Sequence, residues 1–80
     1  MTDLHAIATE LADHPAVYST NVWNDRRVYV NLVGSDRSYA GDRSLKVFFD
    51  AKLGWVFDEG KGIRTSALNA SLDQFRAHVA

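Results

Sequence analysis

The residues of this chain that are best suited to binding another molecule lie in the stretch GSDRSYAGDRS, residues 34–44. The tripeptide Asp-Arg-Ser occurs twice in it, and Tyr39 stands between the two arginines, Arg37 and Arg43. Arginine can donate two parallel hydrogen bonds to a carboxylate or a phosphate, and a tyrosine ring adds a rigid apolar contact. Such a long polar segment is unusual in a small domain rich in hairpins. We therefore expect Arg37, Tyr39 and Arg43 to bind a partner.

Local charge indicates which class of partner these arginines suit. Three arginines directly follow an aspartate, in the pairs Asp25-Arg26, Asp36-Arg37 and Asp42-Arg43, and the formal net charge of the chain is -1. This pairing weakens the local positive field, so it favours directional contact with a protein surface of mixed charge over binding to a polyanion. The alternative is a solvated loop whose aspartates and arginines only form turns and surface pairs.

The pattern of nucleophiles and metal ligands argues against catalysis. His5, His14 and His78 lack the i, i+4 spacing of a helical zinc site, and the chain has no cysteine to complete one. None of the serines has a recognisable base or a nucleophile-elbow context. The sequence therefore predicts a protein that is not an enzyme and that uses neither a metal nor a cofactor.

Length and composition set further limits. Eighty residues suffice for a single domain, residues 1–80, which buries only about 60% of the surface that its unfolded chain exposes. The absence of cysteine fits a reducing compartment. The N-terminal sequence MTDLHAIATE has no secretion signal, and no segment approaches the roughly 20 apolar residues of a membrane span. We expect a cytoplasmic protein that does not enter a membrane.

Hydrophobic periodicity predicts two helices and four strands. The first helix covers residues 2–14 with Thr2 as its N-cap, and the last covers residues 66–80 behind a cap at Thr65 or Ser66. Between them, alternation with period two marks four strands, at residues 16–23, 27–33, 44–50 and 55–57. The simplest way to bury every apolar stripe is an α+β fold, in which a four-stranded antiparallel sheet carries the N- and C-terminal helices on one face.

The register of the first hairpin decides which side chains face the helices. A two-residue loop would pair Val28, Val30 and Leu32 with Asn21, Ser19 and Val17. A three-residue loop at 24–26 pairs them instead with Val22, Thr20 and Tyr18 and makes the more apolar face, so we expect that register. The predicted core then consists of Leu4, Ile7, Leu11, Val28, Val30, Leu45, Val47, Phe49, Leu68, Leu72 and Phe75.

In this register the other sheet face carries a mixture of aromatic and basic side chains. Its members are Trp23, Arg27, Tyr29, Asn31, Lys46 and Phe48. Aromatic rings give contact area at low entropic cost, and arginine adds directional donors. We expect Trp23, Arg27 and Tyr29 to join the partner-binding residues of the loop. The alternative is that the loop 34–44, or a second copy of the chain, covers this face.

A cysteine-free α-β-β-β-β-α chain without catalytic motifs, displaying DRSYAGDRS beside an aromatic sheet face, resembles small proteins of phages and mobile elements. Among these it is similar to the anti-CRISPR proteins. The resemblance lies in the overall outline and implies a stoichiometric inhibitor that binds a Cas effector complex and blocks its nucleic-acid or subunit contacts.

Two other functions remain open at this point. One is a single-stranded nucleic-acid-binding module that uses Trp23, Tyr29 and Phe48 as a stacking platform. The other is a structural dimerisation domain that uses the open face for itself. The acidic first helix and the Asp-Arg pairs argue against the nucleic-acid module.

Overall fold

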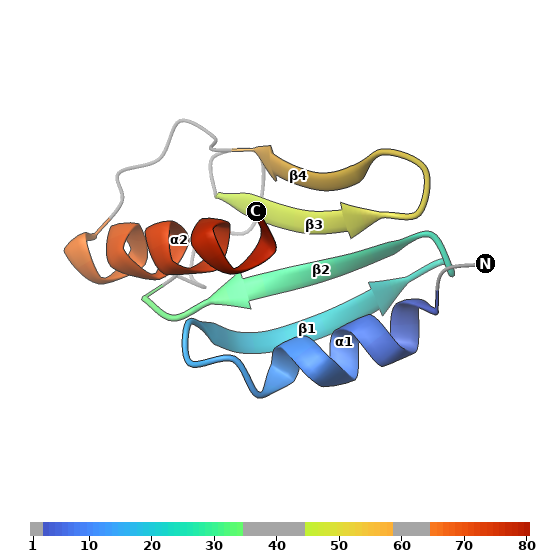
Figure 1. Ribbon diagram of the computed structural model, residues 1–80, viewed down its shortest axis with the longest axis horizontal. Helices are drawn as coiled ribbons and strands as arrows, with labels where there is room; N and C mark the ends of the chain where they lie inside the picture. Colours follow the sequence, from blue (N-terminus) through green and yellow to red (C-terminus); the bar gives the residue numbers. More distant parts are fainter. Residues whose placement is uncertain (1–2, 35–44, 59–64) are drawn as a thin grey trace.

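The computed structural model describes residues 3–34, 45–58 and 65–80, and it confirms the predicted α+β fold (Figure 1). The elements follow the order α1 (Leu4–Ala12), β1 (Val17–Trp23), β2 (Arg27–Leu32), β3 (Lys46–Asp50), β4 (Gly54–Asp58) and α2 (Ser66–Val79). The strands form one antiparallel sheet in the order β1-β2-β3-β4. Both helices pack against the same face, so in the described part of the chain the opposite face carries no helix.

The first hairpin has the predicted three-residue loop. Trp23 pairs with Arg27, and the amide of Arg26 donates to the carbonyl oxygen of Trp23 at 3.1 Å. Asn24 and Asp25 both adopt φ 50°, a left-handed conformation that these two residue types tolerate better than most. The pairs Val22–Val28 and Thr20–Val30 follow, which confirms this part of the predicted register.

The far end of the same hairpin differs from the prediction. Leu32 pairs with Val17 and not with Tyr18, because β1 contains an irregularity between Val17 and Ser19. Regular pairing of β1 with β2 would have placed Tyr18 opposite Leu32 and directed its hydroxyl group into the core. The extra residue instead buries Val17 and leaves Tyr18 exposed.

The helix N-termini are capped by side chains that satisfy free amides. In α1 the cap is Asp3, whose carboxylate accepts from the amide of Ala6 at 3.1 Å. The prediction of Thr2 as the cap is therefore wrong by one residue, and Thr2 itself lies outside the described residues. In α2 the cap is Thr65, one of the two residues predicted, and its hydroxyl group accepts from the amide of Leu68 at 3.1 Å.

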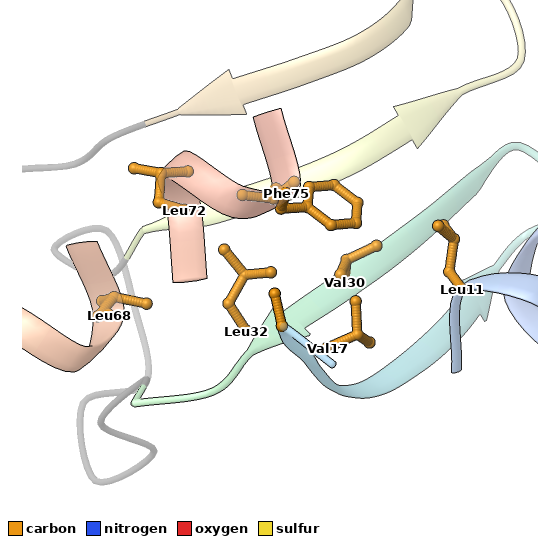
Figure 2. Close-up of a cluster of buried hydrophobic side chains, with 9 residues drawn as sticks. Leu11, Val17, Val30, Leu32, Leu68, Leu72 and Phe75 are labelled. Atoms are coloured by element: carbon orange, nitrogen blue, oxygen red, sulfur yellow. The ribbon is translucent and has the colours of Figure 1, made fainter. Parts of the chain in front are cut away.

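The main core lies between the helices and the sheet (Figure 2). Phe75 of α2 is 0% exposed, and its ring makes edge contacts with those of Trp55 and Phe57 on β4. The buried cluster comprises Leu11, Ala16, Val17, Val30, Leu32, Val47, Leu68, Leu72 and Phe75. Leu4 and Val28 are also buried as predicted, whereas Ile7, Leu45 and Phe49 are only partly buried.

Gly34 allows the end of β2 to approach the first turn of α2. Its φ is +91°, and a Cβ at this position would lie 2.7 Å from the backbone nitrogen of Leu68. The hydroxyl group of Thr65 donates to the carbonyl oxygen of Gly34 at 3.4 Å. A side chain at position 34 would therefore clash with the helix backbone, so α2 fixes the position of Gly34.

Candidate binding surface on the helix-free sheet face

The side chains on the helix-free face follow from strand alternation. Because Val30 and Val47 belong to the core cluster that contains the buried residues of both helices, their neighbours Tyr29 and Phe48 point the other way. Arg27 lies two residues before Tyr29 and therefore shares its face. All six side chains predicted for this face occupy it. We use the name helix-free face for Asn21, Trp23, Arg27, Tyr29, Asn31, Lys46, Phe48, Asp50, Val56 and Asp58.

Three aromatic rings form a continuous ladder across three strands of this face. The ring of Tyr29 on β2 lies 5.3 Å from that of Phe48 on β3 and 6.5 Å from that of Trp23 on β1. Exposure changes sharply along the ladder, since Phe48 is 8% exposed and Trp23 is 47% exposed. The ladder thus has a buried base at the sheet centre and an accessible end at Trp23.

Arg27 is fixed over the base of this ladder. Its Nε donates to Oδ2 of Asp50 at 2.8 Å, and its Nη1 donates to the hydroxyl oxygen of Tyr29 at 3.3 Å. Its guanidinium carbon lies 4.7 Å from the centre of the Phe48 ring, within the range of a cation–π contact. The arginine is therefore held in one orientation while its side chain remains 27% exposed.

Asp50 organises both Arg27 and the turn that follows β3. Its side chain is 0% exposed, and its Oδ1 accepts from the amides of Lys52 at 2.8 Å and Leu53 at 3.1 Å. Its Oδ2 accepts from Arg27 and lies 3.7 Å from Nε of Arg26. Among the described residues no buried side-chain nitrogen or oxygen lacks a hydrogen-bond partner, which is what a buried carboxylate requires.

These contacts shift the ionisation of the pair. The pKa of Asp50 falls from 3.8 to about 2, chiefly through the hydrogen bond from the Lys52 amide and then through that from Arg27, while burial opposes the change. Hydrogen bonds to Tyr29 and then to Asp50 raise the pKa of Arg27. Asp50 therefore stays charged in the folded protein at any ordinary pH and holds Arg27 in place.

The importance of Asp50 was not foreseen from the sequence, although a signal for it exists. Asp50 ends a strand immediately before a turn, where an aspartate commonly accepts from amides two and three residues ahead. The register also places it directly opposite Arg27. Combining the β2–β3 register with this turn preference would have indicated the pair, but the sequence did not define that register.

The charges on the helix-free face balance one another. Arg27 is bonded to Asp50, and Lys46 lies opposite Asp58 in the β3–β4 register. The two basic groups thus match the two acidic ones, and the exposed remainder consists of Trp23 with the amides of Asn21 and Asn31. A surface of this composition suits contact through rings and directional hydrogen bonds.

The other predicted candidates lie elsewhere. Arg37, Tyr39 and Arg43 lie outside the described residues. The rings of His14 and His78 are 4.4 Å apart, and Nδ1 of His14 accepts from the Ala16 amide at 3.0 Å, while His5 lies separately on α1. Within the described parts of the chain, no three histidine, aspartate or glutamate side chains are grouped so that they could hold a metal ion.

No protein-family model matches this chain, and comparisons with curated proteins and with solved structures give no significant match. Over residues 3–34, 45–58 and 65–80, neither helix is long and apolar enough to cross a membrane.

Proposed function

We propose that this chain is a non-enzymatic module that binds a partner protein and acts as an inhibitor, and that its helix-free face makes the contact. The observation that carries the proposal is the half-exposed Trp23 at the end of the aromatic ladder. Arg27, which lies over the base of this ladder, is already held in place by its hydrogen bond to Asp50. Tryptophan, tyrosine and arginine dominate the binding energy of protein interfaces. Groups that are ordered before binding lose less entropy on association.

The charge balance of the face favours a protein partner over a nucleic acid. A phosphate group approaching Arg27 would compete with the carboxylate of Asp50, which is already bonded to Nε. Binding driven by counterion release needs several uncompensated basic groups, and here each basic group faces an acidic one across the sheet. The aromatic ladder alone would suit base stacking, so the nucleic-acid module is the second candidate.

The resemblance to anti-CRISPR proteins supplies a specific candidate partner, a Cas effector complex. We propose stoichiometric blocking, in which the module occupies a nucleic-acid or subunit-contact surface of the effector. Addition of the purified protein to a Cas effector should then abolish cleavage of target DNA at an equimolar ratio. If a large excess leaves cleavage by each effector type unchanged, the partner belongs to another class of protein.

Trp23→Ala is expected to weaken partner binding by about 2 kcal/mol, roughly thirtyfold in Kd, with little change in melting temperature. The ring is half exposed in the free protein and contributes little to the core. The matched control is Val33→Ala, because Val33 is 41% exposed and follows the opposite end of β2. Isothermal titration with the partner measures both variants.

Capture with three baits identifies the partner and tests the face together. The wild-type protein, Trp23→Ala and Val33→Ala are immobilised, and proteins retained from a cell lysate are quantified by mass spectrometry. We expect at least one protein to be retained by the wild type and by Val33→Ala but lost from Trp23→Ala. Identical profiles for all three baits would contradict the proposal, and tight, salt-sensitive binding of oligonucleotides would favour the nucleic-acid module.

The loop prediction is tested separately from the sheet face. Replacing Arg37, Tyr39 and Arg43 together with alanine should weaken partner binding by at least about 1 to 3 kcal/mol. The melting temperature should hardly change, because we expect an exposed loop to contribute little to stability. Full affinity of the triple variant would restrict the binding surface to the sheet.

A further inference from the structure

The two edge strands of the sheet differ in how they are protected. Strand β1 has an irregularity after Val17 and packs against α1, where the hydroxyl group of Thr20 donates to the carbonyl oxygen of Ala8 at 3.2 Å. Bulges and covering helices are devices that stop an edge from pairing with another chain. Strand β4, with the sequence GWVFD, has a regular register, no lysine and no proline.

Within the described residues β4 pairs only with β3. The alternation of hydrogen-bonded and non-hydrogen-bonded pairs between the strands shows which backbone groups of β4 face outward. The amide of Ala51 donates to the carbonyl oxygen of Arg26 at 2.9 Å, so the adjacent pair Arg27–Asp50 is a non-hydrogen-bonded pair. By alternation, Asp50 and Phe48 direct their amides and carbonyls toward β4. The pairs Asp50–Gly54 and Phe48–Val56 are then the hydrogen-bonded ones.

It follows that the amides and carbonyls of Trp55 and Phe57 point away from β3. Their side chains lie on the helix side, where both contact Phe75, and they are only partly buried. Strand β4 thus offers a short row of outward backbone groups flanked by partly exposed apolar side chains. Such a strand is a template for pairing.

We propose that β4 pairs antiparallel with β4 of a second copy of this chain, about a two-fold axis through Val56. Val56 then faces Val56 of the second copy, and Trp55 faces Phe57 of the second copy. Because both of these aromatic residues have outward backbone groups, each of the two symmetric Trp55–Phe57 pairs can exchange two hydrogen bonds. The same register places the acidic Asp58 opposite Gly54 of the second copy, so no like charges face each other.

This pairing would join the two sheets into one. A two-fold axis through an antiparallel pair runs perpendicular to the sheet, so both helix-free faces would lie on the same side. A dimer would therefore present two copies of the Trp23–Tyr29–Phe48 ladder to one partner. The pairing is independent of the proposed function, since it uses the edge of the sheet and not its face.

A charged side chain at position 56, through which the proposed two-fold axis passes, tests the β4–β4 pairing directly. Sedimentation of the wild type from roughly 10 µM to roughly 1 mM should show a species of twice the 8.9 kDa chain mass. Val56→Lys and Val56→Glu should each raise the dimer dissociation constant by about tenfold or more, because each places like charges face to face. An equimolar mixture of the two should regain a heterodimer, and Val56→Thr should dimerise like the wild type.

Circular dichroism checks that each variant is folded, and amide hydrogen exchange of the wild type gives a test that needs no variant. The amides of Trp55 and Phe57 should exchange more slowly at high protein concentration than at low concentration. A wild type that stays monomeric throughout this range overturns the proposal. So does a dimer that both charged variants leave intact, or protection of these two amides that appears only when a different protein is added.

Discussion

Replacing Phe75 with alanine is expected to lower the free energy of unfolding by about 3 to 5 kcal/mol. Phe75 is 0% exposed and connects α2 to β4 through its contacts with Trp55 and Phe57. Removing the ring loses its apolar burial and leaves a cavity between helix and sheet. A domain of this length is stabilised by only roughly 4 to 12 kcal/mol, so the variant should be close to unfolding at room temperature.

Urea denaturation followed by circular dichroism measures this effect. The matched control is Leu53→Ala, because Leu53 is also a large apolar residue but is 67% exposed in the β3–β4 turn. The control should change the unfolding free energy by less than about 0.5 kcal/mol. An equal effect of the two substitutions would mean that α2 does not pack on the sheet through Phe75.

Asp50→Asn is expected to have the second large effect, a fall in melting temperature on the order of 10 °C at neutral pH. Asparagine keeps one oxygen for the amides of Lys52 and Leu53, but its NH₂ group then faces Nε of Arg27. Two donors meet where a partly buried ion pair stood, and the guanidinium loses its charged partner. The turn after β3 and the position of Arg27 should both be disturbed.

The same substitution should change how stability depends on pH. The pKa of Asp50 is about 2 in the folded protein against 3.8 as the reference value, so the folded state binds this proton less readily. Its stabilising contribution is fully present above about pH 4 and is lost as the pH falls toward 2. Asp50→Asn should remove this part of the acid dependence. The control variant Asp73→Asn, at an exposed residue of α2, should leave it in place. An unchanged acid profile for Asp50→Asn would show that the carboxylate is not held as described.

The order of elements could be predicted because each has a clear period in the sequence. The helix stripe that contains Leu68, Leu72 and Phe75 and the alternation in β2 each allow one orientation that buries apolar groups. The three-residue hairpin loop was predictable as well, because Asn24 and Asp25 tolerate positive φ and the resulting register makes the more apolar face.

The irregularity in β1 and the Arg27–Asp50 pair could not be predicted from hydrophobic periodicity, because they depend on how particular side chains pack and pair in the folded protein. Val17 and Tyr18 both fit a strand, and the irregularity in β1 is decided by which of them packs better under α1 and α2. The Arg27–Asp50 pair joins residues 23 positions apart, and it depends on the β2–β3 register, which the number of residues between the two strands does not specify. The aromatic side of the candidate surface was therefore predictable, but the carboxylate that orders it was not.

Amide chemical-shift mapping tests the proposed binding face most directly. The ¹⁵N-labelled protein is titrated with the partner found in the three-bait capture, and the shift changes are assigned along the chain. We expect the largest changes at Asn21, Trp23, Arg27 and Tyr29, with small changes along the exposed sides of α1 and α2. Changes concentrated on the helices, with the helix-free face unaffected, would contradict the assignment of this face as the binding surface.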